Sequence, residues 1–358
     1  MAYNISDDPR IRIIPAEYGE SRYDIVTGFD TFTYLDDFFP KYPKIRKCAV
    51  ITDDTVYDLH FEKISRILDY AGIEYDVLVL PHGENTKNMQ TLSDILSFFA
   101  DKELCRGDVA IAFGGGVIGD ITALAASLYM RGIRYIQIPT TLVAIVDSSF
   151  GGKSAIDLPE GKNLVGAFSN PSLVFSDLSL LSTLPDDELS FGMAEIIKCA
   201  VINKNVCDAI EKGSMVDFIV ASIKAKLDLV AKDPFDKSDR RKLNFGHTLG
   251  HAIENASNYS VPHGKAVAIG MYAITKACVK NGVCADNVLK KLDEFYKLYS
   301  LTKDCPFKTC DLMPFVLHDK KRDSGVISAV LPKDIGEVAV TDMTLTDFEA
   351  LIKLGLGE

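Results

Sequence analysis

The chain has 358 residues, with 50 acidic and 39 basic side chains, which gives a net charge of −11 and a pI near 5.1. This surplus of negative charge argues against a nucleic acid or an anionic membrane as partner, because both are bound through basic faces. With 47% hydrophobic and 25% charged residues, the composition is that of a globular protein, and the length predicts two domains.

Three sequence features predict a cytoplasmic location. Residues 1–9 lack the basic stretch and apolar core of a secretory signal. The longest apolar stretch, 266–279, contains Gly270 and Lys276 and is too short to span a membrane. The eight cysteines include no C-x-x-C pair, which favours free thiols over disulfides or a thiolate zinc site.

The first half of the chain alternates β-branched stretches with helical patterns. Strands are predicted at 47–52, 75–80, 108–113, 135–138 and 173–175, with helices at 61–71, 91–101 and 121–130. Strands that alternate with helices pair in parallel through βαβ crossovers. Residues 1–185 are therefore predicted to form a Rossmann-like α/β domain with a doubly wound, mostly parallel sheet.

The pattern changes after the Thr183-Leu184-Pro185 segment. Helices are predicted at 187–202, 217–231, 246–257, 264–281 and 286–299, and the next strand pattern comes only at 326–331. Residues 186–358 are therefore predicted to form a mostly α-helical second domain.

A glycine motif follows the predicted strand at 108–113. Gly114, Gly116 and Gly119 satisfy G-x-G-x-x-G at a strand-to-helix turn, which favours a pyrophosphate bound at the helix N-terminus. A tight turn without a ligand is the alternative. The acid expected about 20 residues later is missing, so Asp53 at the end of an earlier strand is the candidate for the ribose.

Another loop beyond a strand end, around Glu84 and Lys87, offers a carboxylate and an ammonium at the same sheet edge. On the pattern alone, this loop and Asp53 are equally compatible with surface positions.

Three of the six histidines fall between 247 and 263. His247 and His251 lie four apart on one helical face, and His263 follows a short loop. Three histidines with a carboxylate suit zinc in a catalytic site. The motif is not H-E-x-x-H, because Thr248 follows His247, so a metalloprotease is disfavoured. Core or helix-capping histidines are the alternative.

The helical segment at 187–202 places Glu195 and Lys198 three residues apart among apolar residues. A buried carboxylate needs a cation, and a metal would serve. A surface ion pair is the alternative. The segment 139–168 is rich in glycine and serine and is predicted to be a long functional loop.

Taken together, these motifs resemble the 3-dehydroquinate synthase family of sugar phosphate cyclases. The resemblance runs from about Asp53 to the C-terminus and rests on the segments 115–120, 129–132, 139–142, 147–153, 161–164, 183–185, 192–198, 244–248 and 263–268.

The resemblance implies zinc, with cobalt as a substitute, held by Glu195, His247 and His263. It implies NAD bound by the first domain, through Asp53, Glu84, Lys87, Gly115, Gly116, Val117, Asp120, Thr140, Thr141, Lys153, Lys162 and Thr183. The implied catalytic set is Asp147, Lys153, Asn163, Lys198, Lys226, Arg240, Asn244 and His251. Substrate phosphate and carboxylate would be met by Lys153, by Lys320 or Lys321, and by Arg131 across the interface of a homodimer.

The implied reaction converts the sugar acid phosphate 3-deoxy-D-arabino-heptulosonate 7-phosphate into 3-dehydroquinate and phosphate, in the shikimate pathway of aromatic amino-acid biosynthesis. It proceeds by transient oxidation with NAD, phosphate elimination, reduction, and intramolecular aldol closure. Three alternatives remain: a cyclase for another sugar phosphate, such as a deoxy-inosose or valiolone synthase; a metal-dependent polyol dehydrogenase; and a binding module without catalysis.

Overall fold

The computed structural model describes residues 10–34, 45–320 and 326–358. The chain folds into two compact units, residues 1–185 and 186–358. Residues 1–9, on which the prediction about a secretory signal rests, lie outside the described ranges. Within those ranges, no helix is both long enough and apolar enough to cross a membrane. All eight cysteines lie there too, and none forms a disulfide, as the sequence predicts.

The described part of unit 1 is organised around one seven-stranded sheet in the order β1-β2-β9-β6-β5-β3-β4. An antiparallel hairpin, β1 and β2, forms one edge, and the other neighbours pair in parallel. The parallel sheet is confirmed, whereas the sequence did not predict the hairpin. The strands are β1 (Ile11–Tyr18), β2 (Ser21–Gly28), β3 (Lys47–Asp53), β4 (Glu74–Leu80), β5 (Val109–Gly114), β6 (Arg134–Pro139) and β9 (Leu173–Asp177).

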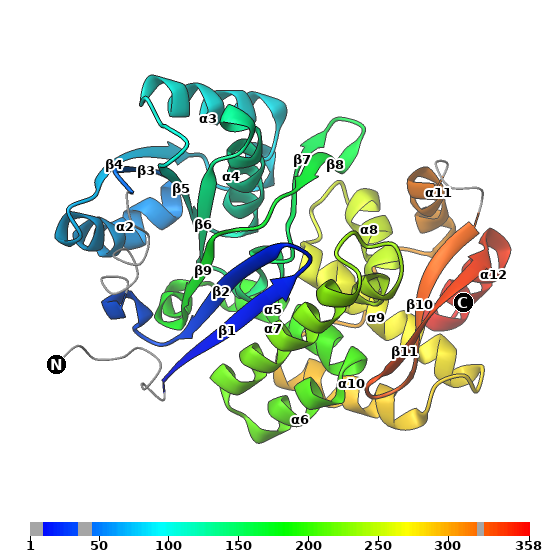
Figure 1. Ribbon diagram of the computed structural model, residues 1–358. Helices are drawn as coiled ribbons and strands as arrows, with labels where there is room; N and C mark the ends of the chain where they lie inside the picture. The colour runs from blue at the N-terminus through cyan, green and yellow to red at the C-terminus, as the bar shows by residue number, and fades with distance from the viewer. Residues whose placement is uncertain (1–9, 35–44, 321–325) are drawn as a thin grey trace. The chain divides into compact units, whose positions relative to one another are not determined.

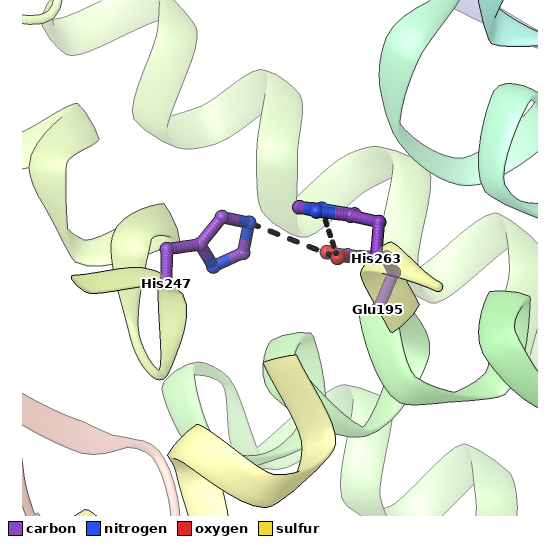
Figure 2. A group of neighbouring side chains, drawn as sticks. All are labelled: Glu195, His247 and His263. Carbon is purple, nitrogen blue, oxygen red and sulfur yellow. Dashed lines mark ion pairs between the residues drawn. The ribbon is translucent and has the colours of Figure 1, made fainter. Parts of the chain in front are cut away.

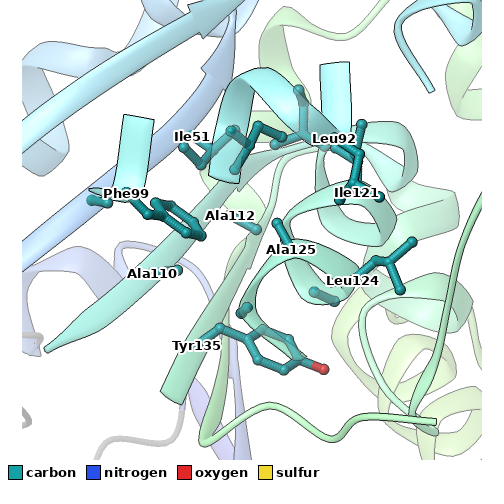
Figure 3. Close-up of a cluster of buried hydrophobic side chains, with 14 of the residues drawn as sticks. Ile51, Leu92, Phe99, Ala110, Ala112, Ile121, Leu124, Ala125 and Tyr135 are labelled. Carbon is teal, nitrogen blue, oxygen red and sulfur yellow. The ribbon is translucent and has the colours of Figure 1, made fainter. Parts of the chain in front are cut away.

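Helices pack on both faces of this sheet (Figure 1). Successive residues of a strand point to opposite faces, so Val50 joins the core beneath α2 (Asp54–Tyr70), whereas Ile51 joins the opposite one. Figure 3 shows this second core, formed with α3 (Met89–Asp101) and α4 (Gly116–Leu128). The three helices confirm the predicted crossovers, although each begins before its apolar pattern.

The strand order places two candidate segments side by side. The chain runs from β3 outward to β4 and returns to β5 on the other side of β3, where Thr52 pairs with Phe113. In such sheets, ligands bind beyond the carboxyl ends of the strands at this reversal. Asp53 ends β3 and Gly114 ends β5, so the reversal lies between the carboxylate and the glycine motif.

The prediction of a long loop at 139–168 is wrong. The segment contains a π-helical turn, η6 (Ala144–Ser148), and an antiparallel hairpin of β7 (Lys153–Leu158) and β8 (Gly161–Phe168). The glycines that suggested a loop allow close backbone approach instead, since a Cβ on Gly166 would lie 2.3 Å from the Ser154 oxygen. Short 3-10 turns occur at η2 (Thr31–Tyr34), η4 (Glu84–Thr86), η5 (Tyr129–Arg131) and η7 (Leu178–Thr183).

Unit 2 is mostly helical, as predicted, and also holds an antiparallel hairpin that begins at the predicted strand. The sequence did not predict α6, α11, α12 or β11 as separate elements. Its described elements are α5 (Asp186–Ile202), α6 (Lys204–Lys212), α7 (Met215–Lys232), η8 (Asp239–Asn244), α8 (His247–Ala256), α9 (His263–Lys280), α10 (Asp286–Leu298), α11 (Thr309–Lys320), β10 (Val326–Asp334), β11 (Glu337–Thr344) and α12 (Leu345–Leu356).

Glycines bring α8 and α9 into close backbone contact. A Cβ on Gly270 would lie 2.2 Å from the Gly246 carbonyl oxygen, and one on Gly250 would lie 3.1 Å from the Val267 Cα. Gly246 also has a φ of 80°, which favours glycine. Because α8 and α9 each begin with a histidine, this packing fixes the backbone positions of both histidines relative to each other.

We expect Gly270→Ala to lower the free energy of unfolding. Alanine gains about 1 kcal/mol of helix propensity, but its methyl group collides with backbone, and overpacking of this kind costs roughly 1–3 kcal/mol. Gly107→Ala is the control, because a Cβ there meets nothing within 4 Å. Urea unfolding of both variants checks this, and a Gly270→Ala protein as stable as the wild type would contradict the close contact.

Candidate active site

Three side chains with metal-binding chemistry converge in unit 2 (Figure 2). Glu195 comes from α5, His247 begins α8 and His263 begins α9. The Nε2 atoms of His247 and His263 lie 3.7 and 3.5 Å from Glu195 Oε1. The three potential ligand atoms all lie within 4.8 Å of one another. Two imidazole nitrogens and one carboxylate match the protein ligands of a catalytic zinc site, which keeps an open position.

Backbone contacts between helices hold this group together. A Cβ on Gly264 would lie 2.6 Å from the Phe191 Cα, so α9 begins directly against α5 one turn before Glu195. The contact between Gly246 and Gly270 fixes α8 against α9 in the same way. The positions of the three candidate ligands therefore depend on residues too small to separate the helices.

Glu195 is a buried charge that depends on its neighbours. Its side chain is 1% exposed, and that of Lys198, whose ammonium pairs with it, is 2% exposed. The pair is therefore buried, which excludes the alternative of a surface ion pair. Burial raises the pKa of Glu195, but Lys198, His247 and His263 outweigh it and hold that pKa well below its usual value.

The two histidines differ in charge state. Burial and the nearby Lys198 ammonium lower the pKa of His247 to about 3, so its imidazole is neutral. Burial lowers the pKa of His263 too, but the carboxylates of Glu195 and Glu254 raise it to about 10.

His247 is oriented as a ligand would be. Its Nδ1 lies 3.2 Å from the Phe245 carbonyl oxygen, to which it donates, which leaves the Nε2 lone pair toward Glu195. Within the described ranges, neither buried oxygen of Glu195 has a hydrogen bond of normal geometry. A divalent cation would accept the Nε2 lone pair of His247 and would also bind the Glu195 oxygens. The residues present therefore fit zinc or cobalt.

His251 lies beside this group but is exposed. Its ring centroid is 5.5 Å from that of His247 and 5.9 Å from that of His263. It belongs to a second group of potential ligand atoms, with Glu254 and His263, and not to the group around Glu195.

Arg240 is buried in unit 2 at 3% exposure, and its guanidinium donates to the Pro234 oxygen at 2.8 Å. The loop before it is organised by Asp233, whose carboxylate accepts backbone N–H groups from Lys237, Ser238 and Arg240. Burial raises the pKa of Asp233, but these hydrogen bonds outweigh it and lower that pKa to about 2. Of the other predicted residues of unit 2, Lys226 is buried on α7, and Asn244 is exposed at the end of η8.

In unit 1, the glycine motif forms the predicted strand-to-helix turn. Gly115 is the N-cap of α4 and gives no side-chain cap, and Gly116 and Val117 open the helix. A Cβ on Gly115 would lie 3.1 Å from Thr141 Cγ2, and a Cβ on Gly116 would lie 3.0 Å from Ser148 Oγ. The turn therefore presents uncapped N–H groups in a narrow space, which fits a pyrophosphate.

Asp53 has a structural role as well, because its Oδ1 accepts the Val56 N–H at 2.9 Å and caps α2. Burial raises its pKa.

Lys87 joins several predicted cofactor and substrate residues. Its side chain is 6% exposed, and its ammonium lies 2.6 Å from Asp120 Oδ2 and 2.7 Å from Asn163 Oδ1. Lys162 pairs with Glu84 at 3.5 Å, so neighbouring residues of the β7–β8 hairpin contact the η4 segment. One connected polar group is thus formed by residues that the resemblance assigned to NAD or to the substrate, namely Glu84, Lys87, Asp120, Lys162 and Asn163.

Further predicted residues lie on the segments that follow β6. The Thr140 N–H donates to the Gly114 oxygen at 3.0 Å, which places Thr140 and Thr141 beside the glycine turn. Asp147 lies in the η6 turn, and Lys153 begins β7 with an exposed side chain.

Of the three remaining predicted anion-binding residues, only Arg131 has a side chain that the structure describes. Arg131 is exposed with a φ of 67°, in a turn where Met130 also has a positive φ. Lys320 ends α11, where the side chain is not described, and Lys321 lies outside the described residues.

Sequence reasoning missed several residues that contact predicted ones, Glu254 and His60 among them. Glu254 Oε2 lies 3.1 Å from His263 Nδ1. His60 Nε2 lies 2.8 Å from the Thr183 hydroxyl, itself a predicted cofactor contact. Glu254 lies one helical turn after His251, and this spacing could have indicated that Glu254 lies near the histidine cluster. No local pattern links His60 to Thr183, because 123 residues separate them.

Known families match most of the chain. The family described as 3-dehydroquinate synthase N-terminal matches residues 77–191, and that described as 3-dehydroquinate synthase C-terminal matches residues 192–322. A 3-dehydroquinate synthase of Symbiobacterium thermophilum is 39% identical over 340 residues, which cover 91% of this chain and 95% of the relative.

Solved structures of sugar phosphate cyclases share the fold. A 2-epi-5-epi-valiolone synthase from Streptomyces hygroscopicus, with NAD+ and Zn2+ bound, aligns with a TM-score of 0.85 at 27% identity, over 96% of this chain and 99% of that one. A 2-deoxy-scyllo-inosose synthase complexed with carbaglucose-6-phosphate, NAD+ and Co2+ aligns with a TM-score of 0.86 at 24% identity, over 95% and 99%.

We expect Lys87→Met to lower the free energy of unfolding by about 3 kcal/mol. This is the low end of the cost of removing one partner from a buried ion pair, because Asp120 is 19% exposed. Arg66→Met is the control, since Arg66 and its partner Glu62 are 75% and 77% exposed, and such pairs contribute under about 1 kcal/mol. Equal losses in urea unfolding would contradict the connected polar group.

Asp233 predicts a pH-dependent term in stability. Its folded pKa of about 2 lies below the ordinary value of 3.8, so its contribution is present above about pH 4 and is lost as the pH falls toward 2. We expect Asp233→Asn to be less stable than the wild type at pH 6, with a difference that shrinks below pH 4. Urea unfolding across this range checks it, and a difference independent of pH would refute it.

Proposed function

We propose that this chain, which belongs to the 3-dehydroquinate synthase family, converts 3-deoxy-D-arabino-heptulosonate 7-phosphate into 3-dehydroquinate and phosphate. It would act as an NAD- and metal-dependent lyase of the shikimate pathway. One structural observation carries the proposal: the potential ligand atoms of His247 and His263 converge with that of the buried Glu195 carboxylate. Relatives 35–39% identical over most of the chain bear this enzyme's name.

The metal would be held by Glu195, His247 and His263. Zinc or cobalt there would supply Lewis acidity at a substrate hydroxyl and the carbonyl derived from it. The fit rests on the neutral His247 imidazole and on carboxylate oxygens buried without normal hydrogen bonds among the described residues. Lys198, whose ammonium pairs with Glu195, would contact the substrate beside this site.

NAD would be held by unit 1, where it would supply reversible hydride acceptance. The uncapped N-terminus of α4 would meet the pyrophosphate, and Asp53 beyond β3 would meet the ribose hydroxyls. The remaining proposed contacts are Glu84, Lys87, Gly115, Gly116, Val117, Asp120, Thr140, Thr141, Lys153, Lys162 and Thr183.

The substrate would be recognised through its carboxylate and phosphate. Lys198, Lys226 and Arg240 are cationic and buried in an otherwise acidic chain. Charged hydrogen bonds to an anion are stronger when water is excluded, so these groups suit a doubly anionic substrate. Contacts would also come from Asp147, Asn163, Asn244 and His251, and from Lys153, Arg131 and Lys320 or Lys321.

The alternatives are less well supported. Curated relatives at 35–39% identity carry the 3-dehydroquinate synthase name, whereas the solved cyclases for other sugar phosphates share 24–27%. A polyol dehydrogenase would have no anionic substrate for the buried lysines and arginine. Cysteines that form no disulfide agree with action in the cytoplasm, and we propose a homodimer in which Arg131 reaches the partner's substrate.

We expect the purified protein with zinc and a catalytic amount of NAD to release phosphate from the heptulosonate phosphate without net NADH. Hydride returns within each turnover, so absorbance at 340 nm stays flat while phosphate rises. NADH in proportion to a simple polyol would indicate a dehydrogenase, and phosphate release from a hexose 6-phosphate alone would indicate another cyclase.

A further inference from the structure

Glu254 is a buried carboxylate without a role in the proposed reaction. It lies on α8, seven residues after His247, and its side chain is 3% exposed. Burying an ionised carboxylate is costly unless it is paired and hydrogen-bonded. Its Oε2 lies 3.1 Å from Nδ1 of His263. The chain thus places a second charge beside the candidate metal group, on the opposite side of the His263 ring from Glu195.

Both ring nitrogens of His263 face a carboxylate. Nδ1 faces Glu254, and Nε2 lies 3.5 Å from Glu195 Oε1. An ionised carboxylate only accepts hydrogen bonds, so Glu254 keeps a proton on Nδ1. When a cation binds at Glu195, the neutral ring that remains has its lone pair on Nε2, which faces the cation. The contact therefore selects both the tautomer and the orientation that ligation requires.

We propose that Glu254 is a positioning residue that holds His263 for metal binding. His247 is oriented by the weaker acceptor, the neutral carbonyl of Phe245 at 3.2 Å. A carboxylate behind an imidazole also raises its basicity toward the metal, and removing such a partner typically weakens metal affinity about 10–100-fold. This inference rests on the metal site of the proposed function.

The same residues suggest a competing arrangement. His251, Glu254 and His263 also bring potential ligand atoms within 4.8 Å of one another, and this group could hold a second cation. Occupying both sites at once would require His263 to lose both ring protons and bridge two metals. A neutral imidazole that donates from Nδ1 and ligates through Nε2 needs no such deprotonation, and the observations favour it. The number of bound metal ions separates the two arrangements.

The test compares cobalt binding by metal-free wild type, Glu254→Gln and Glu254→Ala. Affinity is measured by chelator competition, stoichiometry by titration, and ligand geometry by the visible absorption of bound cobalt. Glutamine keeps the size and one acceptor oxygen but loses the charge. We expect dissociation constants about tenfold higher for glutamine and about a hundredfold higher for alanine, with one cobalt per chain. Circular dichroism of the metal-free proteins checks that the fold is kept.

Two controls separate this inference from the proposed function. Glu294→Gln removes a carboxylate that is 63% exposed on α10 and should leave cobalt affinity unchanged. His247→Ala should abolish stoichiometric binding. Binding that depends on His247 but is unaltered in both Glu254 variants would overturn the inference alone. Two cobalt ions in the wild type, with one lost in the variants, would establish the second cation site instead. A wild type without stoichiometric cobalt would overturn both the inference and the proposed metal site.

Discussion

The charge of Glu195, in the interior of the helical unit, is the constraint on which the site depends. At 1% exposure the carboxylate has lost almost all contact with water, so its ionised form persists only because cationic groups surround it. Lys198 supplies one positive charge on the same helix, His263 supplies another from α9, and the neutral His247 imidazole comes from α8. The imidazoles can reach Glu195 only because the helices touch at Gly264 and at Gly246. Close helix packing is therefore also what provides the neighbours that the buried charge needs.

The sequence predicted the parts of the molecule that follow from local pattern. The parallel sheet, the glycine turn before α4 and the helical second unit follow from periodicity and from strand-to-helix spacing. The β7–β8 hairpin was missed because Gly166 and its neighbours have loop composition, although glycine there serves close strand pairing. The spacing of the histidines predicted that His247 and His263 bind a metal, but only the folded chain shows that Glu195 is buried beside them.

Other features of the site lay beyond any local pattern. The contact of Lys87 with both Asp120 and Asn163 spans 33 and 76 residues, and depends on how the hairpin packs. The role of Glu254 depends on the direction in which the His263 ring faces, which no spacing fixes. Such contacts depend on tertiary packing, because the fold and not the neighbouring sequence determines which side chains meet.

The glycine contacts between α5, α8 and α9 have a consequence for the proposed metal site. Because backbone touches backbone, the three candidate ligands are brought together when the unit folds, and a cation bound there would have little chain left to order. This differs from small zinc domains, in which binding energy is spent on folding the peptide. Such a preorganised site would keep the intrinsic affinity of its donor atoms for the ion, and one divalent ion could replace another without unfolding of the helices.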